Sequence, residues 1–212
     1  MTSPWSIRCW SSTDGHPARA YELVSVPVAP QAFRAALAFL GSAVPADSAF
    51  IVVRLGTGDE TAIRQAIEAA NESHLSPRIC VAVDRATLMA VDFSALDGDR
   101  VGLLLDDIDA ETPLAGMAHD AIEAVRFHAD FVGRASRNLR QGCVLEAMFG
   151  LARNLGLCTL GPRVANADAI SLPGTGFDYV PDGPSDTPAD PVAVSQIGQR
   201  RKKTTRATQF SR

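Results

Sequence analysis

The chain has 212 residues, 46% of them hydrophobic, and a mean hydropathy of +0.05. These values are typical of one globular domain with a sizeable core, and no uncharged apolar run reaches the roughly eighteen residues that span a membrane. Because Met1 to Trp10 lacks a basic segment followed by an apolar core, the sequence indicates no signal peptide and predicts a cytoplasmic location.

The formal charge of −4 is unevenly distributed along the chain. Six basic residues and no acidic ones lie between residues 200 and 212, which leaves the rest of the chain near −10. An acidic body excludes a uniformly basic nucleic-acid-binding surface. Residues 190–212 are predicted to be a flexible basic tail, either solubilising or in contact with nucleic acid, acidic lipid or an acidic partner. Residues 1–189 are predicted to form the domain.

The predicted elements alternate between strands and helices. A hairpin of strands 6–10 and 19–26 is followed by helix 31–40, strand 50–55, helix 60–71, strand 78–83, an ambiguous connection over 86–96, strand 102–108, helix 114–124, strand 124–132, helix 140–155 and strand 156–160. From Pro162 onward proline and glycine are frequent, so closure of any barrel must occur there or fail. This βα alternation predicts a parallel α/β barrel, whose reactive face is formed by the carboxyl ends of the strands.

Four cysteines, Cys9, Cys80, Cys143 and Cys158, are widely scattered and form no CxxC pair. A metal knuckle is therefore not indicated, and buried reduced thiols are expected instead.

Two strand ends carry the most informative residues. Strand 102–108 ends in the adjacent carboxylates Asp106 and Asp107, and the next strand reads Val-Arg-Phe-His from Val125 to His128. This spacing resembles the EAL family of cyclic-di-GMP phosphodiesterases, whose central strand ends in Asp-Asp-Phe and whose next strand carries Leu-Lys-Ile-Asp. The resemblance covers roughly residues 6–185 and implies an EAL-type modified TIM barrel. Only about 24 residues separate the hairpin from strand 50–55, so the barrel is expected to be shortened or incomplete, with one outer helix missing.

The resemblance also implies a site in which several carboxylates and an asparagine hold two divalent metals. Of that ligand set the chain retains Glu22, Asp106 and Asp107. The other positions of the family's motifs are substituted: Val26 for the arginine of Glu-Ala-Leu-x-Arg, Arg54 for the metal-binding asparagine, Ala82 for the bridging glutamate, Arg126 for the catalytic lysine, His128 for the following aspartate, and Pro162 and Ala165 for two glutamates. Three carboxylates are too few for two cations that each require about six oxygens.

Each of these residues has more than one interpretation. Asp106 and Asp107 are expected to be remnants that accept hydrogen bonds at a strand end, with binding of one cation as the alternative. His128 is either a general base or an ordinary polar residue at the barrel mouth. Four arginines at strand ends, Arg54, Arg85, Arg126 and Arg163, are expected to pair with acids inside the protein, the alternative being a phosphate or an acidic partner peptide.

The sequence therefore predicts a catalytically inactive, stand-alone EAL-like regulatory or adaptor protein that holds no metal or cofactor and binds a protein partner or a second copy of itself. Exposed apolar strand surface left by a missing helix would favour such assembly. Cyclic-di-GMP is not expected to bind, because the arginine of the family motif is replaced by Val26. The alternative is a sensor that binds cyclic-di-GMP without cleaving it. A hydrolase that uses one metal on the three retained carboxylates is a third hypothesis.

Overall fold

The computed structural model describes residues 6–14, 19–26, 30–55, 60–91, 93, 100–113, 117–162, 176–181 and 187–188. The predicted tail, 190–212, and positions 163 and 165 lie outside the described residues. Among the described helices, none is long and apolar enough to cross a membrane.

Eight strands close into a barrel: β1 (Ser6–Ser12), β2 (Arg19–Val26), β3 (Phe50–Leu55), β4 (Arg78–Val83), β5 (Val101–Ile108), β6 (Ile122–Phe127), β7 (Cys158–Leu160) and β8 (Tyr179–Pro181). Strands β2 to β8 are parallel neighbours in chain order, and β1 pairs antiparallel with both β8 and β2 to complete the ring. A short strand, β9 (Thr187–Pro188), pairs antiparallel with the first residues of β1, Ser6 and Ile7. The barrel is therefore closed rather than incomplete.

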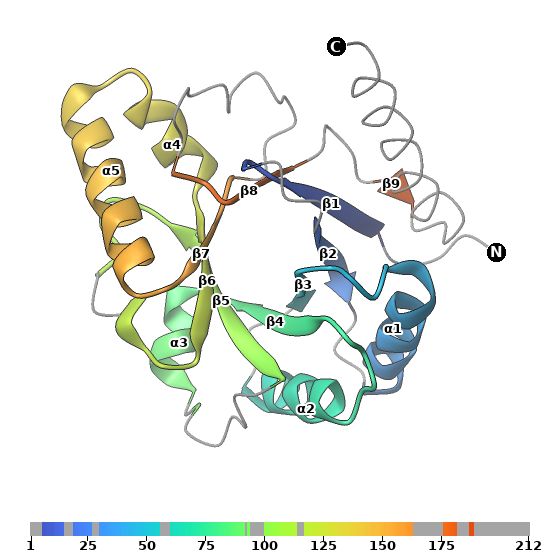
Figure 1. Cartoon of the computed structure of the whole chain (residues 1–212). Helices are drawn as coiled ribbons and strands as arrows, with labels where there is room; N and C mark the ends of the chain where they lie inside the picture. Colours follow the sequence, from blue (N-terminus) through green and yellow to red (C-terminus); the bar gives the residue numbers. More distant parts are fainter. Residues whose placement is uncertain are drawn as a thin grey trace, which may run out of the picture.

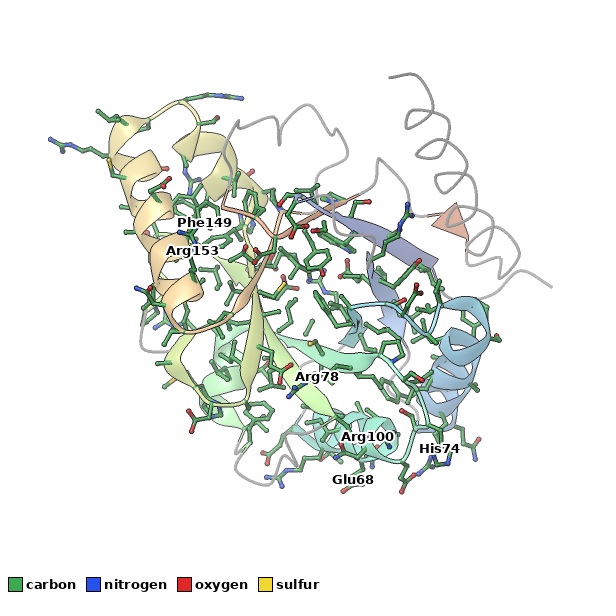
Figure 2. All side chains as sticks on the ribbon, viewed as in Figure 1. Glu68, His74, Arg78, Arg100, Phe149 and Arg153 are labelled. Carbon is green, nitrogen blue, oxygen red and sulfur yellow. The ribbon has the colours of Figure 1, made fainter. Side chains whose placement is uncertain are left out.

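Helices lie outside the ring of strands (Figure 1). They are α1 (Pro30–Ala43), α2 (Glu60–Asn71), α3 (Arg85–Ala90), α4 (Ala129–Ala135) and α5 (Leu139–Asn154). Phe149 of α5 points toward the strands (Figure 2), where its ring contacts those of Phe127 and Phe177 at centroid distances of 5.1 and 4.9 Å. Burial of these large aromatic surfaces holds α5 against β6.

Alternate residues of each strand supply two separate apolar layers. On β5, for example, Leu103 and Leu105 belong to the large layer between strands and helices, whereas Leu104 belongs to the smaller cluster inside the barrel. The inner cluster comprises Trp10, Ala20, Phe50, Val52, Cys80, Leu104, Ala124 and Leu160. Because side chains alternate between the two faces of a strand, residues two positions further along also point into the barrel. The inner cluster therefore forms an apolar floor beneath the inward-facing residues at the carboxyl ends of the strands.

Two expectations around β6 are wrong. In the segment 114–124, where a helix was expected, the described residues form only a short turn before β6 begins at Ile122, and residues 114–116 lie outside the described part. The strand expected over 124–132 ends at Phe127 and is followed by α4. His128 caps that helix, its side chain accepting a hydrogen bond from the backbone N–H of Asp130. A run of apolar residues is compatible with either a buried strand or a buried helix, so periodicity did not separate the two.

The cysteines agree with the expectation in part. Cys80 is buried inside the barrel, and its burial raises the pKa of the thiol to about 12. Cys143, by contrast, is exposed on α5.

Candidate functional site

The candidate site lies inside the barrel at the carboxyl ends of the strands. Glu22, Arg54, Asp106 and Arg126 each come two residues after a member of the inner apolar cluster, on β2, β3, β5 and β6 respectively. They therefore form a polar layer directly above the apolar floor. This is the face on which parallel barrels place their chemistry.

Arg126 is the centre of this layer. Its Nε donates to Oδ1 of Asp106 at 2.7 Å and its Nη2 to Oδ2 of the same residue at 2.5 Å, a bidentate pair. Its Nη1 donates to Oε1 of Glu22 at 2.8 Å. All three side chains are buried, with exposed fractions of 1% for Arg126, 0% for Glu22 and 4% for Asp106. We refer to Glu22, Asp106 and Arg126 as the arginine–carboxylate cluster.

Arg126 remains charged despite its burial. Burial alone lowers the pKa of a guanidinium, but the carboxylates of Glu22 and Asp106 outweigh that effect and raise the pKa of Arg126 above its ordinary value. The guanidinium carbon also lies 5.8 Å from the ring centroid of Trp10, within the range of a cation–π contact. Two carboxylates and one ring thus fix the cation in place.

Two further arginines approach the carboxylates of the cluster. Arg8 lies opposite Glu22 in the β1–β2 pairing, and its Nη1 is 4.0 Å from Oε2 of that residue. Arg54 Nη2 is 3.8 Å from Oδ2 of Asp106 and 3.7 Å from Oδ2 of Asp107. Internal pairing of the strand-end arginines is therefore confirmed for Arg54 and Arg126.

Asp107 differs from Asp106 in environment and in backbone. Its side chain is 49% exposed, and its φ of 57° lies in the left-handed region, which aspartate tolerates better than most residues. Partial burial and the neighbouring charge of Asp106 raise the pKa of Asp107, against the opposing effect of Arg54. Its backbone N–H donates to Oδ1 of Asp106 at 2.9 Å. Asp106 therefore acts as a hydrogen-bond acceptor at the strand end, as the sequence predicted.

The residues present do not fit the divalent cations that the EAL resemblance implies. Both oxygens of Asp106 and one of Glu22 accept hydrogen bonds from Arg126, so a metal ion on these oxygens would lie against a buried positive charge. Within the described part of the chain, no group of three or more aspartate, glutamate, histidine or cysteine side chains is placed to hold a metal ion. A cation entering here would have to displace a buried guanidinium from two carboxylates.

Above the cluster is a cavity of about 500 Å³ at the barrel mouth. Its lining is strongly acidic and comprises Asp84, Arg85, Ala86, Met89, Asp106, Asp107, Asp109, Glu111 and Thr112. Asp84 caps α3, where its Oδ1 accepts from the backbone N–H of Thr87 at 2.8 Å, and this hydrogen bond lowers the pKa of Asp84. Arg85 lines the same cavity, so the strand-end arginines do not all point into the arginine–carboxylate cluster.

The other predicted site residues lie around this layer without joining it. Ala82, on β4, pairs in register with Arg54 and supplies no polar group. His128 caps α4 and donates no group to the arginine–carboxylate cluster among the contacts described above. Pro162 is buried after β7, and Val26 ends β2, where its side chain lies outside the described part. The predicted position Ala165 also lies outside it.

Sequence reasoning missed two members of the site, Trp10 and Arg8. Both lie on β1 and face residues of the site across the barrel or across the hairpin. The signal for Arg8 was available, because a hairpin with the observed register places it directly opposite Glu22, and opposite charges in that position attract.

No protein-family model matches this chain, and no curated protein matches it. Solved structures do match. The EAL domain of Mycobacterium smegmatis DcpA has a TM-score of 0.68 at 14% identity, over 92% of this chain and 95% of that chain. The PaMucR phosphodiesterase in complex with c-di-GMP gives 0.63 at 15%, over 84% and 87%. The FimX EAL domain from Pseudomonas aeruginosa, bound to c-di-GMP, gives 0.61 at 13%, over 86% and 90%.

These matches define the class of fold. The chain has an EAL-like fold, a closed barrel whose strand order and antiparallel first strand accommodate the motif positions described above. The resemblance inferred from the Asp106–Asp107 strand is therefore confirmed at the level of the fold.

Proposed function

We propose that this protein is a catalytically inactive EAL-like regulatory protein that acts by binding another protein. The observation that carries the proposal is the placement of Arg126, which occupies with its own charge the carboxylates that a divalent cation would need. Hydrolysis of a phosphodiester at neutral pH in this family depends on metal-activated water, as the resemblance implies. Without the cations, neither the water nor the leaving oxygen is activated.

Recognition of cyclic-di-GMP is also disfavoured by charge. The ligand carries two phosphates, whereas the cavity at the mouth is lined by five carboxylates and one arginine, Arg85. Arg54, a second cation near the opening, is already shared by Asp106 and Asp107. An anionic ligand entering this cavity would meet net repulsion.

The binding of a protein is supported by apolar side chains that the fold leaves uncovered. Leu139, the first residue of α5, is 84% exposed, and Met89, on α3 beside the mouth cavity, is 77% exposed. Single exposed apolar residues are common, but these two are the most exposed large hydrophobic side chains of the described residues. Leu139 lies next to Arg140, so the contact surface around it combines an apolar side chain with a positive charge.

The catalytic part of the proposal is tested with the full-length protein. Cyclic-di-GMP is titrated calorimetrically with Mg²⁺, with Mn²⁺ and with chelator, and the mixtures are then separated to look for cleavage products. Neither heat nor product is expected. Cleavage would refute the assignment as inactive. Metal-independent binding without cleavage would establish the alternative, a non-catalytic sensor, which Arg85 at the mouth makes the second candidate.

The partner-binding part has its own experiment. Wild-type protein and the variants Leu139→Lys and Leu155→Lys are used as bait, and the proteins retained are compared by mass spectrometry. Leu155 is the matched control, since it lies just beyond the other end of α5 and is 41% exposed. A protein retained by wild type and by Leu155→Lys but lost with Leu139→Lys is the expected result. Identical retention by all three baits would remove Leu139 from the interface, and light scattering of the same samples distinguishes a second copy of the chain from another protein.

A further inference from the structure

We propose that the guanidinium of Arg126 is a permanent, intramolecular substitute for a divalent cation, and that it closes the carboxyl end of the barrel without metal. The proposal rests on the part of the proposed function that assigns no metal to this chain, and it adds a structural role for the cation. It does not depend on which partner the protein binds.

The position of Arg126 in the ring of strands carries the argument. On the ring, three strands separate β2 from β6 in either direction, so these strands lie on opposite sides of the barrel. Arg126, on β6, nevertheless contacts Glu22 on β2 at 2.8 Å, and it binds Asp106 on the adjacent strand β5. One side chain therefore crosses the interior and connects residues separated by 104 positions in the sequence.

The chemistry of the group matches that of a bound cation in one respect and differs in another. Three N–H donors engage three oxygens of two carboxylates, so the guanidinium provides the directed positive charge that a small metal ion provides. A metal ion exchanges with solvent and is removed by chelators, whereas Arg126 is covalently part of β6 and stays protonated. The three hydrogen bonds of the cluster should accordingly be present whether or not divalent metal is in solution.

Removal of the guanidinium has a specific consequence. Truncation to alanine leaves Glu22 and Asp106 buried, facing one another across a space of guanidinium size, with Arg8 and Arg54 only at 4.0 and 3.8 Å. Two buried carboxylates without their central cation are strongly destabilising. The vacated space should then accept either a soluble guanidinium or a divalent ion with oxygen ligands.

The test is thermal unfolding of full-length wild type, Arg126→Ala and Arg54→Ala, each with Mn²⁺, with chelator, with millimolar ethylguanidinium and with ethylammonium as the ligand control. Wild type is expected to have the same Tm in Mn²⁺ and in chelator. Arg126→Ala is expected to melt about 10 °C lower and to recover part of that loss with ethylguanidinium or Mn²⁺ but not with ethylammonium. Arg54→Ala, which removes a half-exposed cation from the same carboxylates, is expected to show neither the large loss nor the recovery.

The outcomes separate this inference from the proposed function. A Tm of wild type that rises with Mn²⁺ and falls with chelator, or an Arg126→Ala protein that no cation restores, would overturn the substitution. If Arg126→Ala does not fold, Arg126→Lys replaces it: the smaller ammonium keeps the charge, so a partial loss of Tm that ethylguanidinium does not reverse is expected. A wild-type Tm in that variant would also overturn the proposal. Cleavage of cyclic-di-GMP is measured separately and bears only on the proposed function.

Discussion

The arginine–carboxylate cluster predicts an unusual pattern of stability when its members are replaced by apolar residues. Arg126→Met leaves two buried carboxylates without the donors that now hold three of their oxygens. Removing one partner from a buried ion pair costs about 3–5 kcal/mol, and here two charges lose their partner at once. Asp106→Leu should lower the free energy of unfolding by less, because Arg126 and Glu22 remain as an ion pair at 2.8 Å with no net charge.

Replacement of all three residues should reverse most of this loss. The triple variant Glu22→Leu, Asp106→Leu, Arg126→Met leaves no member of the cluster charged, and its side chains continue the apolar floor upward. Such apolar replacements of buried ionic groups are often neutral or stabilising. We expect the triple variant to be within about 1 kcal/mol of wild type, and therefore more stable than Arg126→Met alone.

The assay is urea-induced unfolding of the full-length proteins followed by circular dichroism, with the free energy of unfolding compared among the variants. The order expected is wild type and triple variant, then Asp106→Leu, then Arg126→Met. A triple variant less stable than Arg126→Met alone would refute the reasoning, since residues of one network must couple. A loss of unfolding free energy below about 1 kcal/mol for Arg126→Met would also refute the reasoning, because an exposed ion pair contributes that little.

Three further variants, one of them with a matched control, test single features of the mouth and of α5. Asp107→Asn should raise the free energy of unfolding at pH 7 by about 0.5 kcal/mol, a small gain because the side chain is half exposed. The raised pKa of Asp107 means that the wild-type protein loses stability as pH rises through that pKa and the carboxyl group ionises. In acid, where Asp107 is protonated, urea unfolding should therefore show no gain from the substitution. Asp84→Ala should cost about 1 kcal/mol by the same assay, and the difference from wild type should shrink as pH falls through the lowered pKa of Asp84. Gly156→Ala should lower the free energy of unfolding by about 1 kcal/mol, because Gly156 has φ 72° at the end of α5, whereas Gly150→Ala, with no atom near the added methyl group, should not.

Much of the barrel could be predicted from local patterns. The bounds of β3, α2 and β4 agree with the sequence prediction at both ends, because short apolar runs alternate there with an amphipathic helix whose apolar face repeats at helical spacing. The prediction failed at β6 and α4, where Phe131 and Val132 continue an apolar run although the backbone has already turned into a helix. Only the capping contact at His128 marks that change, and histidine is not a common cap.

The sequence predicts that the candidate site contains internal ion pairs, but not which arginine pairs with which carboxylate. Replacement of family ligands by arginines indicated internal ion pairs, yet the sequence gives no reason why Arg126 rather than Arg54 or Arg85 should reach the buried carboxylates. That choice follows from the place of β6 in the closed barrel, next to β5 and opposite β2, which the tertiary structure sets. Arg85, on a helix outside the ring, cannot make the same contact.

The two arginines on the carboxylates therefore have different physical roles, which follow from their exposure. Arg126 is 1% exposed and forms bidentate and cross-barrel hydrogen bonds, so water does not weaken its attraction for Glu22 and Asp106. Arg54 is 38% exposed and no closer than 3.7 Å to an acid, so solvent and salt screen most of its effect. Charge at the mouth can thus respond to salt or to a partner through Arg54 and Asp107, while the layer beneath stays fixed. A binding surface at this end of the barrel would act through those exposed groups, because the arginine–carboxylate cluster below them is buried and its three N–H donors are already paired.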